Sequence, residues 1–117
     1  MQDTLAPLYE YCEKHTTLPD SLLHQVERAT HLQTLAPRML SGHLQGSLLS
    51  IISKMVSPHH ILEIGTFTGY SAIALAQGLN DHGKLTTIEY NPEHAAIAER
   101  FFQQSAYAAQ IDLLVGD

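Results

Sequence analysis

Two carboxylates and two glycines lie where parallel-sheet proteins commonly bind a ligand. Glu63 stands near the end of the apolar run "HILEI", and Glu89 ends a second run, "KLTTIE", 24 residues after Gly65. Gly65 permits a tight turn without a Cβ clash, and Gly69 lets the next segment and a ligand approach the backbone. An acid at the first place pairs with a cation or accepts hydrogen bonds and repels a pyrophosphate, whereas one at the second commonly binds ribose hydroxyls. The four residues therefore predict a ligand with a ribose and a positive amine but no phosphates.

Other nucleotide-binding motifs fit this stretch poorly. A phosphate-binding P-loop has four residues between its glycines, followed by Lys and then Ser or Thr. Here three residues separate Gly65 from Gly69, and Tyr70-Ser71 follow. The dinucleotide fingerprint G-x-G-x-x-G is also absent, because residue 67 is Phe, and an NAD-type oxidoreductase is therefore disfavoured. Glycines that serve packing alone remain an alternative.

The elements that must position these residues alternate along the second half of the chain. Apolar runs of strand length are separated by segments of helical spacing, and Asn91 followed by Pro92 is typical of a helix N-terminus. This order predicts an α/β fold, a Rossmann-like doubly wound parallel sheet (its first three strands) preceded by N-terminal helices. We expect strands at 60–64, 84–89 and 111–115, and helices at 3–14, 19–32, 43–56, 70–79 and from 92 onward.

The predicted sheet begins well after the N-terminus. We divide the chain into an N-terminal helical segment, residues 1–40, and the N-terminal half of a Rossmann-like domain, residues 41–117. Three strands are half of a typical doubly wound sheet. We therefore expect the chain to be the front half of a larger domain.

Composition disfavours several classes of partner and location. The chain has 117 residues, of which 44% are hydrophobic, and a net charge of −6 without a basic stretch, which argues against nucleic acid and anionic membranes. No apolar run approaches the roughly 20 residues of a membrane span, and the N-terminus lacks the pattern of a signal peptide. Cys12 is the only cysteine and the eight histidines are scattered, so we expect no metal site among these residues. A cytoplasmic protein is the expectation.

The stretch "LEIGTFTGYSAIALA" resembles motif I of class I S-adenosylmethionine-dependent methyltransferases. More narrowly, it is similar to the caffeoyl-CoA and catechol O-methyltransferase-like family, in which E-I-G-x-x-T-G-Y-S is close to a signature. The upstream segment "MLSGHLQGSLLSIISKMV" resembles the same family. The resemblance covers about residues 19–117 and implies that residues 41–117 are the N-terminal half of a methyltransferase domain.

The resemblance implies a set of residues around the methionine part of S-adenosylmethionine. Glu63 and the backbone of Gly65 and Thr66 would surround it, and Ser71, which opens the next helix, would bind its carboxylate. Ser41 occupies a position whose backbone and side chain touch the same end of the cofactor.

The other end of the cofactor is assigned in the same way. Glu89 would hold the ribose diol, and Asp117 would lie next to the adenine ring. In this family a divalent metal such as Mg²⁺ is held by acidic and amide ligands after the fourth and fifth strands, which would lie beyond Asp117. The residues present therefore predict a cofactor half-site and no catalytic residue.

Taken with the resemblance, the residues predict an S-adenosylmethionine-dependent O-methyltransferase. It would transfer a methyl group to a hydroxyl of a small aromatic, catechol-like acceptor, and the family resemblance suggests a homodimer. A non-catalytic module that binds S-adenosylmethionine or another nucleoside is the alternative.

Overall fold

Three strands form one parallel sheet in the order β1-β2-β3. The computed structural model describes residues 2–117, and side-chain surroundings from Thr4 onward. The strands are β1 (His60–Ile64), β2 (Lys84–Glu89) and β3 (Ile111–Val115), as their apolar runs predicted. The register places Glu63 opposite Thr87, and Thr87 opposite Leu113, so the carboxyl ends of all three strands meet at one edge. The predicted α/β sheet is thereby confirmed.

Helices precede and connect the strands. Asp20 caps the second helix by accepting a hydrogen bond from the Leu23 N–H at 2.9 Å, and Asn91 caps the last one by accepting from the Glu93 N–H at 2.8 Å. Among the described residues, no helix combines the length and the apolar character needed to cross a membrane. The helices are α1 (Gln2–Lys14), α2 (Ser21–Gln33), the short 3₁₀ helix η1 (Pro37–Met39), α3 (Gly42–Val56), α4 (Tyr70–Ala76) and α5 (Pro92–Gln104).

Helix α4 ends at Ala76 rather than at the predicted residue 79. The Ser53 hydroxyl of α3 donates to the Leu75 carbonyl oxygen at 2.6 Å, and the Gly78 N–H bonds to the same carbonyl in a tighter turn. A Cβ on Gly78 would lie 2.2 Å from the Ser53 carbonyl carbon. The close contact between α3 and α4, which the local sequence pattern does not encode, therefore ends the helix.

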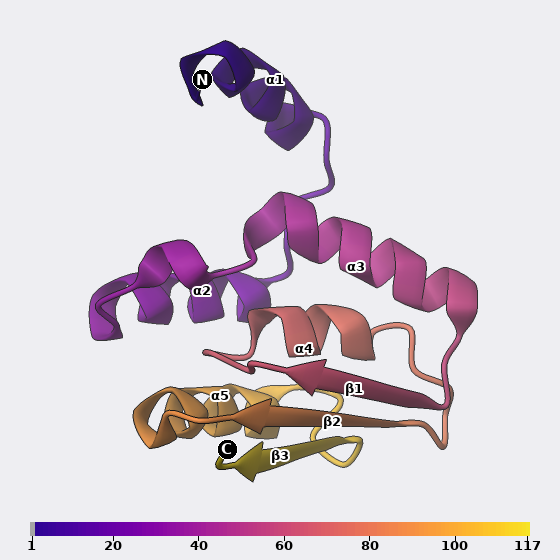
Figure 1. Cartoon of the computed structure of the whole chain (residues 1–117). Coiled ribbons are helices and arrows are strands. Elements are labelled where there is room, and N and C mark those ends of the chain that lie inside the picture. The colour runs from indigo at the N-terminus through magenta and orange to yellow at the C-terminus, as the bar shows by residue number, and fades with distance from the viewer. Residues whose placement is uncertain (1) are drawn as a thin grey trace.

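The helices cover one face of the sheet. Leu85 of β2 is fully buried in one core with Ile73 of α4 and Phe102 of α5. On the opposite face, Leu62 and Ile64 of β1 remain exposed. Figure 1 shows α3 lying over α4, and α1 standing apart from these layers near the N-terminus. Leu23 and Val26 of α2 also belong to this core. The predicted boundary between an N-terminal helical segment, residues 1–40, and the Rossmann-like half-domain, residues 41–117, stays a prediction.

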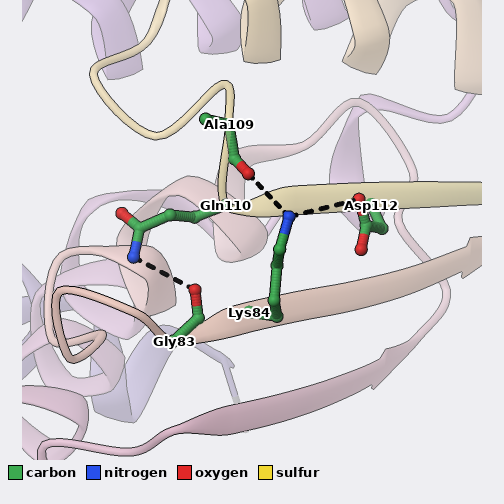
Figure 2. Close-up of polar contacts among 5 residues, drawn as sticks. All are labelled: Gly83, Lys84, Ala109, Gln110 and Asp112. Atoms are coloured by element: carbon green, nitrogen blue, oxygen red, sulfur yellow. Dashed lines mark hydrogen bonds and ion pairs between the residues drawn. The ribbon is translucent and has the colours of Figure 1, made fainter.

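Polar contacts fasten the amino ends of β2 and β3 (Figure 2). The carboxyl ends, which carry Glu63 and Glu89, lie at the other end of the strands. Lys84 Nζ donates to the Ala109 carbonyl oxygen at 2.8 Å and lies 3.9 Å from an Asp112 carboxylate oxygen. The Gln110 amide donates to the Gly83 carbonyl oxygen at 3.1 Å. Because the ion pair is half-exposed, it contributes little stability, and the bonds to backbone carbonyls do more to hold the register.

Candidate functional site

The turn between β1 and α4 has already used most of its amide groups. The Gly65 and Thr66 N–H groups donate to the Ile88 carbonyl oxygen at 2.8 and 3.2 Å. The Phe67 N–H donates to Glu89 Oε1 at 2.7 Å, and the Gly69 N–H to the Thr66 carbonyl oxygen at 3.0 Å. A phosphate-binding loop needs such amides free to point at the ligand. The turn instead lies beside the carboxylate oxygens of Glu63 and Glu89, which suit a cation or hydrogen-bond donors.

Both glycines of the turn have left-handed backbone angles. Gly65 has φ +91° and nothing lies within 4 Å of a Cβ built on it, so the space beside it is open. Gly69 has φ +98°, and a Cβ there would lie 2.8 Å from the ring of Phe102. Gly65 therefore leaves room beside the turn, whereas Gly69 permits close packing onto α5. Phe67 adopts φ 51°, an uncommon conformation for a bulky residue.

Glu63 is held from two sides in a partly buried position. The Thr87 hydroxyl donates to its Oε1 at 2.7 Å, and the Ser71 hydroxyl donates to its Oε2 at 2.5 Å. Burial raises the pKa of the Glu63 carboxyl, the bonds from Ser71 and Thr87 lower it, and the negative charge of Glu89 raises it. The net pKa lies above the ordinary value. Glu63 is thus an acid whose charge depends on its hydroxyl partners.

Glu89 is 8% exposed and ties three segments together. Its Oε1 accepts from the Phe67 N–H of the turn, and its Oε2 accepts from the Asn91 N–H at 2.9 Å. Its own carbonyl oxygen accepts from the Gly116 N–H at 2.8 Å, which joins the ends of β2 and β3. Each carboxylate oxygen keeps a second lone pair. Glu89 can therefore accept further hydrogen bonds from a ligand while it holds the turn.

Four of the predicted residues line a small cavity beside the turn. It has a volume of about 50 Å³ and is lined by the turn, the loop before α3 and the first turn of α4. Ser41 contributes to this wall without capping α3 through its side chain. The predicted residues in the wall are Ser41, Gly65, Thr66 and Ser71.

The remaining predicted residues lie around this cavity without lining it. Glu63 accepts a hydrogen bond from Ser71, and Glu89 accepts one from the Phe67 N–H. Ser71 and Phe67 both belong to the cavity wall. Asp117 is exposed and follows Gly116 at the carboxyl end of β3. The structure thus gathers all the predicted positions at one edge of the sheet, and their roles toward a ligand stay predictions.

Tyr70 also lines a wider cavity, which is formed mainly by α3 and by the segment 15–20 between α1 and α2. The wider cavity has a volume of about 570 Å³, and Tyr70 lines both. Its ring lies against Gly46, where a Cβ would be 2.6 Å from the ring. Burial, with the negative charges of Glu27 and Asp20, raises the pKa of the Tyr70 phenol to about 12. The Tyr70 side chain that lines both cavities is therefore uncharged at neutral pH.

Sequence reasoning gave Thr66 a role only through its backbone, and it missed the threonine hydroxyls that support the site. Thr66 Oγ1 and Thr87 Oγ1 lie 2.5 Å apart, and both side chains are buried. Thr30 of α2 and Thr68 of the turn form a second buried hydroxyl pair at 2.7 Å. The alternation of β2 places Thr87 on the same face as Glu89, which is the one signal that could have pointed to it.

Phe67, in the middle of the turn, is buried. Its ring meets that of His94 edge-on, with the two centroids 4.8 Å apart. Within residues 2–117, no three His, Cys, Asp or Glu side chains are grouped as metal ligands. The described residues therefore provide no set that fits a divalent metal.

Comparison with known proteins identifies the family. A family model described as O-methyltransferase matches residues 13–117. Catechol O-methyltransferases of Niastella koreensis and Mycobacterium tuberculosis are 36% identical over 72 residues and 35% identical over 80 residues. These matches cover 62% and 68% of this chain, and 33% and 36% of the two relatives.

A solved structure agrees with the fold over the whole chain. The O-methyltransferase from Bacillus cereus in complex with SAH aligns with a TM-score of 0.90 at 29% identity, covering 100% of this chain and 53% of its own. The chain thus spans about a third of the length of the two curated relatives and about half of this structure. Because the family model matches nearly the whole sequence, the chain belongs to the O-methyltransferase family.

Proposed function

We propose that the protein is an S-adenosylmethionine-dependent O-methyltransferase that acts on a hydroxyl of a small aromatic, catechol-like acceptor. Family membership supports methyl transfer to oxygen. Two relatives named catechol O-methyltransferase support the acceptor class, and the Bacillus cereus structure in complex with SAH (S-adenosylhomocysteine) supports the donor. A homodimer remains part of the proposal through family resemblance alone.

The observation that carries the proposal is the pair of acids beside a turn whose amides are occupied. Glu63 and Glu89 lie near the carboxyl ends of adjacent parallel strands, and the Gly65, Thr66 and Phe67 N–H groups all donate within the protein. Such a site repels phosphates and attracts a ligand with a positive amine and hydroxyl donors. S-Adenosylmethionine has an ammonium group, a ribose diol and no phosphate.

Each acid has a distinct role in this proposal. Glu63, aligned by Ser71 and Thr87, would bind the ammonium group next to the open side of Gly65. Glu89 would accept the ribose hydroxyls on its second lone pairs, and the exposed Asp117 would lie beside the adenine ring. Ser41 and the first turn of α4 would close the methionine end.

The described residues would contribute binding and orientation to the reaction. S-Adenosylmethionine, when bound, supplies a methyl group activated by a positively charged sulfur. Holding it in a fixed position converts methyl transfer into an effectively unimolecular step, which can contribute several kcal/mol to catalysis. We assign no step to a metal, because residues 2–117 group no suitable ligands, and the ligands implied beyond Asp117 stay a prediction.

Two measurements on the full-length protein test the proposal. Calorimetric titration with SAH should show binding that inorganic pyrophosphate does not compete with. Incubation with radiolabelled S-adenosylmethionine and catechol should give a labelled methyl ether. The reaction is run both with and without added Mg²⁺, and product in either condition supports the proposal. SAH binding without transfer to any tested hydroxyl would favour the non-catalytic binding module, and absence of SAH binding would refute the proposal.

A further inference from the structure

Four side chains form a hydrogen-bonded chain through the site. Thr66 Oγ1 and Thr87 Oγ1 lie 2.5 Å apart, and Thr87 Oγ1 lies 2.7 Å from Glu63 Oε1. Ser71 Oγ lies 2.5 Å from the other oxygen of Glu63. Thr66 is 1% exposed and Thr87 is 0% exposed. Because water does not reach these two hydroxyls, each must find its partners inside the protein.

Counting protons gives each bond a direction. An ionised carboxylate only accepts hydrogen bonds, and a threonine hydroxyl has one proton to donate. Thr87 donates its proton to Glu63, so Thr66 must donate to Thr87. The hydroxyl protons of Thr87 and Ser71 then point to Glu63, and that of Thr66 points to Thr87. Each bond in the chain polarises the next. This arrangement stabilises a negative charge on Glu63 where burial opposes it.

We propose that Thr87 is a positioning residue of the donor site, which holds the Glu63 carboxylate ionised and aimed at the ammonium group of the methyl donor. The inference rests on the function proposed above. Thr87 is the register partner of Glu63 on the neighbouring strand, so both side chains share the helix-covered face of the sheet. Ser71 holds the second oxygen from α4, so the carboxylate cannot rotate without losing a bond.

The surroundings of Glu63 predict how binding responds to pH. From β2, the Thr87 hydroxyl lowers the pKa of Glu63 and the charge of Glu89 raises it; from α4, the uncharged Ser71 lowers it; burial is the largest influence and raises it. Removing the Thr87 hydroxyl should therefore raise this pKa further. Because an ammonium ligand needs the ionised carboxylate, affinity falls as the pH drops through the pKa of Glu63. The loss should begin at a higher pH when Thr87 is replaced by valine.

The test is calorimetric titration of the full-length protein with SAH between pH 5 and pH 8, with urea unfolding of each variant. Up to about pH 7 the amino and carboxyl groups of SAH keep their charges, so changes there report on the protein. Thr87→Val should bind more weakly at pH 6, because a larger fraction of Glu63 is protonated there. The loss should reach up to roughly ten-fold, the factor by which one lost hydrogen bond to a charged group shifts an ionisation equilibrium. The variant should recover part of this loss as the pH rises.

Two matched variants control for structural effects. Thr87→Ser keeps the hydroxyl and should retain both the affinity and the pH profile of the wild type. Thr86→Val makes the same chemical change one residue away on the other face of β2, and it should alter neither. If Thr87→Val fails to fold, Thr66→Val removes only the donor to Thr87 and should move the profile in the same direction by a smaller amount.

The outcomes separate this inference from the proposed function. A wild-type protein that does not bind SAH would overturn both. The positioning role alone would be overturned if the wild type binds SAH and folded Thr87→Val keeps the same affinity and pH profile. If only Thr66→Val folds, the same result in that variant would overturn it. A loss of affinity that is equal at every pH would indicate a purely structural role for Thr87 and would overturn it as well.

Discussion

Replacing Glu89 by alanine should weaken the fold and the binding of SAH, and the two effects can be measured separately. In the free protein the substitution leaves two backbone N–H groups, those of Phe67 and Asn91, without their acceptor. A buried donor left unsatisfied costs about 1–3 kcal/mol. Because the Phe67 bond is buried and the Asn91 bond only partly so, we expect a loss of about 2–4 kcal/mol in the free energy of unfolding, measured with urea.

The effect on binding has a different origin. If Glu89 accepts hydrogen bonds from the ribose diol, each contributes about 1.5–3 kcal/mol. At 1.4 kcal/mol per factor of ten, losing one such bond should weaken SAH binding by roughly ten-fold to a hundred-fold, and losing both by roughly a hundred-fold or more. Glu89→Gln should lose less affinity and less stability, because its amide keeps one acceptor oxygen. Calorimetric titration with SAH in urea-free buffer, in which each variant is folded, measures this loss of affinity.

A neighbouring acid provides the control. Glu93 is exposed in the first turn of α5 and its side chain holds no part of the turn. Glu93→Ala removes the same charge and should leave SAH affinity within a factor of about two. If folded Glu89→Ala and Glu89→Gln bound SAH as tightly as the wild type, the ribose assignment would be wrong, and Glu89 would be a purely structural acid.

Three further changes have consequences that other assays can check. Gly65→Val should abolish SAH binding in calorimetry, because a β-branched residue strains a turn at φ +91° and its side chain enters the open space beside it; unchanged affinity in a folded variant would move the site elsewhere. Gly78→Ala should lower the urea midpoint by more than any surface substitution, since its Cβ would lie 2.2 Å from the Ser53 carbonyl carbon; an unaffected midpoint would contradict the close helix contact. Residues 1–117 expressed alone should self-associate through the exposed sheet face that includes Leu62, and a monodisperse monomer in light scattering would contradict this.

The framework of the fold could be predicted because its signals are local. Each strand is a short apolar run bounded by turn residues, and all three were predicted with the bounds that the structure has. Asn91 and Pro92 start α5 through a cap that is visible in the sequence. Where tertiary contacts decide, prediction failed: α4 ends at Ala76 because α3 packs against it at Gly78.

The candidate site was predictable as a set of positions, but its hydrogen bonds were not. Thr86 and Thr87 are the same residue type, and alternation alone tells that they face opposite sides of the strand. Only the register between β1 and β2 reveals that Thr87 is the one beside Glu63. The bond from the Phe67 N–H to Glu89 likewise depends on a turn whose left-handed Phe67 has no signal in the sequence.

These contacts change what an acid at a strand end means. Read as ligand chemistry alone, Glu89 would be free to give both oxygens to a ribose. In the structure the same oxygens already hold the glycine turn and the start of α5, so the site is organised before any ligand arrives. Glu63 is prepared in the same way by Thr87 and Ser71. A preorganised site spends less binding energy on ordering its own groups. Tight binding of the methyl donor should therefore depend on the same hydrogen bonds whose removal weakens the fold.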